Sequence, residues 1–109
     1  MTHVNKVTVT GSNGFVGQAL CKYLCEINYD VIGTVRDDSK STSDYKCVPI
    51  GEIDSHTDWR PALRGRNTVV HLAGRAHVLR DRLNSPINEF RRINTLGTIN
   101  LAQQAIELG

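Results

Sequence analysis

The sequence lacks the features that mark membrane-spanning and secreted proteins. Its 109 residues contain no apolar run that approaches the ~20 residues a membrane-spanning helix needs. Residues 1–6 contain no apolar segment of the signal-peptide type. These absences argue against a membrane partner, and the expected location is the cytoplasm.

Cysteine is scarce, and its arrangement suits neither a disulfide framework nor a metal site. The three cysteines, Cys21, Cys25 and Cys47, are odd in number and form no C-x-x-C motif. A metal centre would need further ligands at suitable spacing, and none is evident. Cys21 and Cys25 are four residues apart on an expected helix, so they share a face. We expect reduced, buried thiols and no metal.

The sequence also lacks a strong excess of charge of one sign. The formal net charge of +2 gives no indication of nucleic acid as a partner. The arginine pairs Arg64/Arg66 and Arg91/Arg92 are interpreted as solvated surface. With 39% hydrophobic and 22% charged residues, the composition is that of one small folded domain.

The most informative stretch is residues 7–17. A β-branched run ending at Thr10 leads into Gly11, Gly14 and Gly17, spaced G-x-x-G-x-x-G, with Asn13 inside the loop. A helical pattern begins directly afterwards. Glycine lets the backbone approach a phosphate closely, and a helix N-terminus offers unpaired N–H groups and a positive dipole end. The pattern therefore predicts a loop that holds the pyrophosphate of a dinucleotide.

Strand-like and helix-like segments alternate along the whole chain. The expected strands are residues 4–10, 31–35, 47–50 and 68–74, and the expected helices are residues 14–27, 58–63 and about 86–108. Pro49 indicates an edge strand or a strand end. The fourth strand is apolar on both faces, as in buried parallel sheets. This order predicts an α/β fold, a Rossmann-like, doubly wound parallel sheet of about four strands with flanking helices.

Two helices carry stripes that predict which face is buried. The first has an apolar stripe made of Phe15, Val16, Ala19, Leu20, Tyr23, Leu24 and Ile27. The last has a stripe in which Asn94 and Gly97 stand among Phe90, Ile93, Leu101, Ala105 and Leu108. A polar side chain and a residue without Cβ on a packed face indicate that a polar group lies close by.

The residues after the second strand bear on which dinucleotide binds. NAD enzymes commonly place an acid there, for the ribose 2′-hydroxyl. A count of about 20 residues from the glycine loop reaches Val35 and Arg36. Arg36 suits the 2′-phosphate of NADP, whereas the adjacent Asp37 suits NAD if the strand ends later. Both cofactors stay open, with NADP favoured by Arg36.

Three motifs in this order resemble the extended short-chain dehydrogenase/reductase family, over nearly the whole chain. They are Thr10-Gly11-x-x-Gly14-Phe15-Val16-Gly17, Val70-His71-Leu72-Ala73-Gly74 and Asn94-x-x-Gly97-Thr98. The residues around the second and third motifs resemble its nucleotide-sugar branch, the NAD-dependent epimerase/dehydratases that include UDP-glucose 4-epimerases and 4-keto-reductases of polysaccharide synthesis. The resemblance implies a UDP-sugar substrate, with hydride exchange between its C4 and the nicotinamide, and homodimers formed through later helices.

The resemblance also implies roles for individual residues. Gly11, Gly14 and Gly17 would cradle the pyrophosphate, with Phe15 and Val16 entering the helix beneath it. Glu52 and Ile53 stand where the family usually has Asp and an aliphatic residue beside the adenine. Further expected cofactor contacts are Leu72, Ala73 and Gly74 along the ribose and phosphates, Asn94 from the long helix, and Arg75 in the loop that faces cofactor and substrate.

The acid/base pair of that family, Tyr-x-x-x-Lys, is missing. None of Tyr23, Tyr29 and Tyr45 is followed by Lys four residues later. We therefore expect residues 1–109 to be the N-terminal part of a NAD(P)-binding domain, without catalytic residues or the substrate domain, and inactive alone. The alternative is a natural, non-enzymatic module that senses NAD(P). The sugar, and the choice between epimerase and reductase, stay open.

Overall fold

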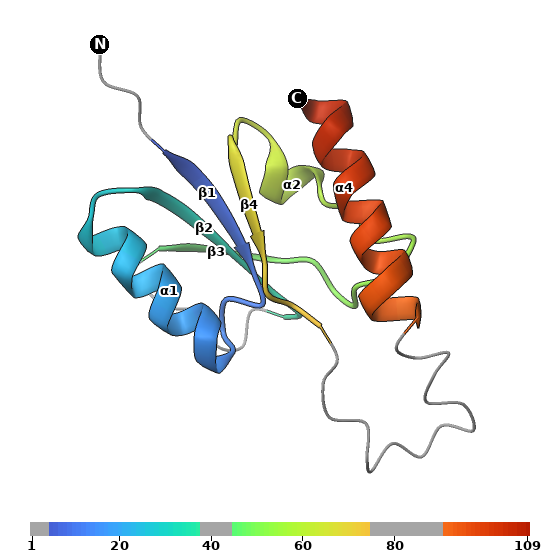
Figure 1. Cartoon of the computed structure of the whole chain (residues 1–109), viewed down its shortest axis with the longest axis horizontal. Coiled ribbons are helices and arrows are strands. Elements are labelled where there is room, and N and C mark those ends of the chain that lie inside the picture. The colour runs from blue at the N-terminus through green and yellow to red at the C-terminus, as the bar shows by residue number, and fades with distance from the viewer. Residues whose placement is uncertain (1–4, 38–44, 75–90) are drawn as a thin grey trace.

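The computed structural model describes residues 5–37, 45–74 and 91–109. In these ranges the strands are β1 (Lys6–Thr10), β2 (Asp30–Val35), β3 (Lys46–Pro49) and β4 (Thr68–His71). The helices are α1 (Phe15–Glu26), α2 (Arg60–Leu63), the π-helical turn η1 (Arg91–Leu96) and α4 (Gly97–Leu108). The predicted Arg75 lies outside the described residues. Figure 1 shows the elements in their arrangement.

The four strands form one parallel sheet in the order β3-β2-β1-β4, as the alternating pattern predicts. Thr10 at the end of β1 pairs with Thr34 on one side and with His71 on the other. Val35 pairs with Pro49 at the end of β3. All four carboxyl ends therefore lie along one edge of the sheet, and the loops that follow them gather there. Pro49 ends an edge strand, as expected.

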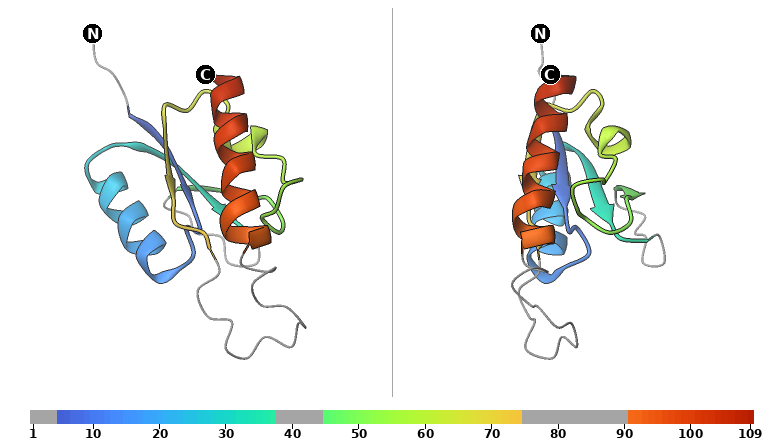
Figure 2. Two further views of the ribbon diagram at one scale, coloured as in Figure 1. Left: turned by 45° about the vertical axis from the view of Figure 1, so that its right-hand side comes forward. Right: turned by 90° about the vertical axis from the view of Figure 1, so that its right-hand side faces the viewer.

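Helices cover both faces of this sheet. Figure 2, with the right-hand side of Figure 1 facing the viewer, shows α4 in front of the sheet and α1 behind it. The core on the α1 side contains Val7, Val9, Cys21, Leu24 and Val31. The core on the other side contains Trp59, Leu63 and Leu101. The architecture is thus a Rossmann-like layer of helix, sheet and helix.

Strand β1 is buried on both faces although half of its interior side chains are polar. Val7 and Val9 pack against α1, while Thr8 and Thr10 alternate to the opposite face and are fully buried. The Thr8 hydroxyl donates to the carbonyl oxygen of Ala62 in α2 at 2.6 Å. Burying a hydroxyl costs little free energy once it has a hydrogen-bond partner. Thr8 therefore joins β1 to α2.

The predicted buried face of the first helix is wrong in part. Phe15 is 94% exposed and Tyr23 58% exposed, and Val16, Ala19 and Ile27 are also exposed. Leu24 is buried as predicted, and Gly17 and Cys21, which the predicted stripe does not include, are buried with it. The reason is that Gly17 must fit beneath the glycine loop, and this contact sets the rotation of the helix.

Two other boundaries differ from the prediction. The fourth strand ends at His71, so Leu72, Ala73 and Gly74 form a loop. In β4 the Thr68 side chain is exposed and the other three are half-buried, not fully buried as expected, because β4 lies at the edge of the described sheet. In the last helix, Gly97 and Leu101 are buried as expected, whereas Asn94 and Leu108 are exposed.

Arg66 is a structural residue, which corrects its interpretation as solvated surface. Its side chain is only 6% exposed and pairs with the Asp30 carboxylate at 3.2 Å. One terminal nitrogen donates to the carbonyl oxygen of Val7 at 2.9 Å and to that of Asp30. Arg66 thus ties β1 to β2 toward the amino ends of the strands. In the described part of the chain, no helix is long and apolar enough to span a membrane.

Candidate functional site: a cavity at the carboxyl ends of the strands

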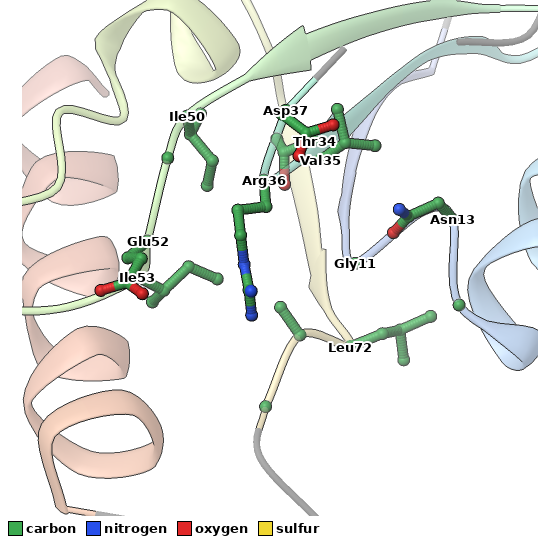
Figure 3. A pocket seen from close by; sticks show the side chains of 14 residues that line it. Gly11, Asn13, Thr34, Val35, Arg36, Asp37, Ile50, Glu52, Ile53 and Leu72 are labelled. Atoms are coloured by element: carbon green, nitrogen blue, oxygen red, sulfur yellow. The ribbon is translucent and has the colours of Figure 1, made fainter. Parts of the chain in front are cut away.

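A cavity of about 460 Å³ opens where the carboxyl ends of the strands meet the loops that follow them. Figure 3 shows the side chains that line it. They come from the glycine loop, the end of β2, the segment after β3 and the loop after β4. The lining residues are Gly11, Asn13, Gly14, Thr34, Val35, Arg36, Asp37, Ile50, Gly51, Glu52, Ile53, Leu72, Ala73 and Gly74. Ligands of open α/β sheets bind at this edge.

The glycine loop is shaped by close contacts that exclude side chains. Gly11 has φ +65°, and a Cβ there would meet the backbone of Ala73 at 3.0 Å. A Cβ on Gly17 would collide with the carbonyl oxygen of Gly11. Gly11 therefore lets the loop turn against the segment after β4, and Gly17 lets α1 pack beneath the loop.

The N-terminus of α1 opens on the cavity without a capping side chain. Gly14 is the N-cap residue and makes no side-chain cap hydrogen bond, and the first turn carries no acidic residue. A Cβ on Gly14 would meet only the carbonyl oxygen of Gly11, at 3.3 Å. The first N–H groups of this helix thus lie beside the cavity with the positive end of the dipole, an arrangement suited to an anion.

Ser12 and Tyr45 brace the loop from behind. Ser12 is fully buried, and both its backbone N–H and its hydroxyl donate to the Thr34 carbonyl oxygen, at 3.2 and 3.3 Å. The Tyr45 hydroxyl donates to the Ser12 carbonyl oxygen at 3.5 Å. Burial, and then the neighbouring Cys21 thiol, raise the pKa of Tyr45 to about 12. Tyr45 therefore keeps its proton at neutral pH and serves as a donor to the loop.

The end of β2 brings charged side chains to the cavity. Arg36 and Asp37 both line it and both are exposed. Figure 3 shows the Arg36 side chain reaching into the space between Ile53 and Leu72. The segment after β3 is held alongside, because Ile50 and Gly51 donate their N–H groups to the carbonyl oxygens of Val35 and Arg36, at 2.9 and 3.0 Å.

Two amides of α4 fix the loop that follows Glu52 and Ile53. Asn100 donates to the carbonyl oxygens of Asp54 and Thr57, at 3.2 and 2.8 Å. Gln104 donates to the Thr57 carbonyl oxygen at 2.7 Å and accepts from the Trp59 N–H at 2.8 Å. The Thr57 hydroxyl in turn donates to the carbonyl oxygen of Glu52 at 2.8 Å. Helix α4 therefore positions one wall of the cavity.

Thr10 holds the opposite wall. Its hydroxyl oxygen accepts the N–H groups of Leu72 and Ala73, at 3.0 and 3.1 Å. The same hydroxyl lies 2.7 Å from Nδ1 of His71, whose ring meets the Trp59 ring edge-on. Burial lowers the pKa of His71 below its ordinary value of 6.5. The imidazole is accordingly neutral at pH 7.

Of the fourteen residues expected to contact the cofactor, thirteen lie in the described ranges, and nine of these line the cavity while four do not. The nine are Gly11, Asn13, Gly14, Arg36, Glu52, Ile53, Leu72, Ala73 and Gly74. Phe15 and Val16 are exposed on α1, Gly17 lies beneath the loop, and Arg75 is outside the described residues. Asn94 lies next to the site, with its Oδ1 3.1 Å from the position that a Cβ on Gly74 would take.

The expected contact set omits several residues that shape the site. Thr34, Ile50 and Gly51 line the cavity, and they follow from the strand order once β2 and β3 are known to be neighbours. Asn100 and Gln104 act through the loop after Glu52. Their signal in the sequence is a pair of amides four residues apart on one helical face.

The cysteines give no sign of a second site. Cys21 is buried, Cys25 and Cys47 are half-buried, and no disulfide bond joins any of the three. Burial raises the pKa of the Cys21 thiol, which keeps it protonated and unreactive. Within residues 5–37, 45–74 and 91–109, no cluster of three or more His, Cys, Asp or Glu side chains is arranged to hold a metal ion.

Comparison with known proteins places this geometry in a family. The sequence model of the NAD dependent epimerase/dehydratase family matches residues 7–109. The chain belongs to this family. It is 40% identical over 104 residues to UDP-glucose 4-epimerase of Vibrio cholerae, a match that covers 94% of this chain and 31% of that protein. It is 30% identical over 77 residues to ketoreductase nvfG of Aspergillus novofumigatus, covering 62% and 22% of the two chains.

Solved structures of the same family have the same fold. MoeE5 in complex with UDP-glucuronic acid and NAD superposes with a TM-score of 0.78 at 26% identity, covering 96% of this chain and 34% of that one. UDP-N-acetylglucosamine 4-epimerase from Bacillus cereus superposes with a TM-score of 0.71 at 27% identity, covering 95% and 32%. The chain therefore spans about a third of the length of these family members.

Proposed function

We propose that the cavity binds the adenosine and pyrophosphate parts of NAD(P), and that this chain is the cofactor-binding part of a nucleotide-sugar epimerase. The observation that carries the proposal is the uncapped N-terminus of α1, which opens on the cavity through Gly14. A Cβ on Gly14 would meet the carbonyl oxygen of Gly11 at 3.3 Å, a tight contact, and would also narrow the space at the helix end. Room beside unpaired N–H groups is what a pyrophosphate needs.

The other walls suit the rest of the cofactor's adenosine half. Ile50 and Ile53 offer apolar surface for an adenine, and Glu52 lies beside them with its carboxylate near the cavity. Leu72, Ala73 and Gly74 form a wall whose backbone approaches Gly11 closely. A cavity in which apolar side chains stand beside placed polar and charged groups suits such a cofactor.

Arg36 favours NADP within this proposal. Its side chain reaches into the cavity beside the adenosine walls, where a guanidinium would pair with a 2′-phosphate. Asp37 supports the competing assignment, because a carboxylate at this position would accept a hydrogen bond from the ribose 2′-hydroxyl of NAD. Arg36 thus favours a phosphate at the ribose 2′ position, whereas Asp37 favours a hydroxyl there.

For the reaction, we propose a longer parent protein acting on a UDP-sugar at C4. The similarity to UDP-glucose 4-epimerase of Vibrio cholerae and to a UDP-N-acetylglucosamine 4-epimerase supports this assignment. Bound nicotinamide would supply hydride exchange. Residues 1–109 contain no Tyr-x-x-x-Lys pair, so this chain would bind and orient the cofactor, while acid/base groups and sugar-binding residues would come from outside it. Such a protein would act in the cytoplasm, as a homodimer.

An NADPH-dependent keto-sugar reductase is the second candidate. The specific observation in its favour is Arg36 in the cavity, since a reductase of this kind consumes NADPH. The similarity to a ketoreductase is a further, weaker support.

Calorimetric titration of this chain with NAD, NADH, NADP and NADPH tests the proposal. We expect NADP and NADPH to bind about tenfold more tightly than the other two, as a charge-assisted pair contributes, and Arg36→Ala to remove the difference. Asp37→Ala is the matched control and should leave NADP binding intact. Tighter NAD binding that Asp37→Ala weakens would instead assign NAD as the cofactor and remove the support that Arg36 gives to the reductase. If the folded chain binds none of the four, the proposed site is wrong for this chain.

A further inference from the structure

An unbroken chain of hydrogen bonds runs from a wall of the cavity to α4 through His71. Thr10 accepts the N–H groups of Leu72 and Ala73 and lies 2.7 Å from Nδ1 of His71. On the other side of the ring, Nε2 lies 3.2 Å from the Thr98 hydroxyl. Thr98 donates to the carbonyl oxygen of Asn94 at 2.9 Å. The chain joins all three of the motifs that carry the family resemblance.

Counting donors and acceptors along this series of hydrogen bonds leaves one possible position for the proton on the His71 ring. A hydroxyl has two lone pairs and one proton. Both lone pairs of Thr10 are taken by the N–H groups of Leu72 and Ala73, so Thr10 can only donate to His71. Nδ1 must then be unprotonated. Because the Thr98 proton goes to Asn94, Nε2 of His71 must carry the ring proton and donate to Thr98.

The surroundings of His71 favour this neutral ring. Among the residues that the structure describes, the ring contacts the hydroxyls of Thr10 and Thr98 and lies perpendicular to the fully buried Trp59 ring, and these three groups carry no charge. Burial lowers the pKa of His71. An imidazolium would donate from both nitrogens, and its Nδ1–H would face an oxygen whose lone pairs are already occupied.

We propose that His71, as the Nε2–H tautomer, is a positioning residue for the cavity: it orients the Thr10 hydroxyl so that Thr10 holds the backbone of Leu72 and Ala73 in place. Its second nitrogen fixes the ring against Thr98 of α4. Where the effect on cofactor is concerned, this inference rests on the proposed function. The tautomer and the backbone contact do not depend on it.

Ring-nitrogen NMR of the chain labelled with ¹⁵N tests the tautomer directly. We expect the His71 ring at pH 7 to show an unprotonated Nδ1 and a protonated Nε2, and to titrate below the ordinary histidine pKa of about 6.5. Loss of the signal in His71→Asn assigns it among the four histidines. A protonated Nδ1 at pH 7 would overturn the proposal, whether or not the chain binds a cofactor.

Amide hydrogen exchange tests the positioning role. In His71→Leu, which offers Thr10 no acceptor, exchange at Leu72 and Ala73 should accelerate relative to the rest of β1 and β4. His71→Asn places an amide oxygen where Nδ1 stood and should restore protection. His56→Leu, at an exposed histidine, is the control. Equal exchange at the two amides in the Leu and Asn variants would contradict the role. Should His71→Leu fail to fold, His71→Gln gives the same comparison, because its longer side chain places the amide near the position of Nε2 and offers Thr10 no acceptor at the position of Nδ1.

Nucleotide titration then links the backbone contact to binding. We expect His71→Leu to weaken NADP or NAD binding about tenfold, the order of effect when a buried hydroxyl loses its acceptor, and His71→Asn to recover most of it. If the wild-type chain binds no nucleotide, the proposed function fails for this chain, and the tautomer and the exchange rates still decide the role of His71. If a folded His71→Leu variant binds NADP or NAD as tightly as the wild-type chain, His71 contributes to stability and does not position the cavity wall for the nucleotide.

Discussion

Single residues explain how a polar interior is tolerated beside the cavity. Thr8 and Thr10 are fully buried on β1, and the Thr8 hydroxyl has its partner in α2 while the Thr10 hydroxyl has its partner at the end of the neighbouring strand β4. Arg66 is likewise a buried polar side chain with partners. Its guanidinium contacts Val7 and Asp30 toward the amino ends of the strands. Buried polar groups of this kind cost free energy when their partners are removed.

Replacing Arg66 by Met should lower stability without touching the cavity. Met retains most of the apolar stem, while the carbonyl oxygens of Val7 and Asp30 lose their shared donor. We expect the free energy of unfolding to fall by about 2 kcal/mol, measured by urea denaturation. The exposed Arg64→Met is the control. A loss no larger than that of Arg64→Met would show that the contacts of Arg66 are unimportant.

Arg66 also shows where residue-level prediction from sequence ends. Arg64 and Arg66 are equally charged and two positions apart, and nothing local distinguishes them. Arg66 is buried because the chain between α2 and β4 passes the amino ends of β1 and β2, as its contacts show. That proximity depends on the strand order, which a local pattern does not contain.

At the scale of elements, the order of strands and helices was predictable, whereas the rotation of α1 was not. The alternation of β-branched runs and helical stripes is local, and the structure confirms the four-stranded parallel sheet. The close fit of Gly17 beneath the glycine loop decides which face of α1 is buried. The number of apolar residues on each face does not decide it, so Phe15 and Tyr23 stay exposed. The π-helical turn at Arg91–Leu96 was likewise not predictable, because the apolar pattern of the last helix continues through it.

The N-terminus of α1 allows a test that separates helix stability from ligand binding. Asp is a favoured N-cap residue, and the extended backbone of Gly14 (φ −78°) is open to it. We expect Gly14→Asp to leave the melting temperature unchanged or higher. It should nevertheless weaken nucleotide binding at least tenfold, because a carboxylate would stand beside the pyrophosphate.

Gly14→Ala is the size-matched control for that change. It adds a Cβ without charge, and the nearest atom, at 3.3 Å, has to give by only a few tenths of an ångström. Binding should therefore fall much less than with Asp. If the Asp and Ala variants bind nucleotide equally well, the phosphates do not lie at this helix end.

At the scale of the whole molecule, the described chain is one layered unit whose functional edge is built from four separate loops. Residues as distant as Gly11, Glu52 and Gly74 line one cavity because parallel strands place their carboxyl ends together. The chain covers about a third of the length of its relatives. The reaction of a complete enzyme would then depend on what lies beyond this edge, and the contribution proposed for this chain is the cofactor site.

Mapping of backbone amide shifts during titration with NADP and with NAD tests that central claim most directly. The account predicts that the shifted amides surround the cavity, in residues 11–17, 35–37, 50–53 and 72–74. Amides toward the amino ends of the strands, near Arg66 and Asp30, should stay unchanged. Shifts that cluster away from the cavity, or spectra unchanged by either nucleotide in a folded chain, would contradict it.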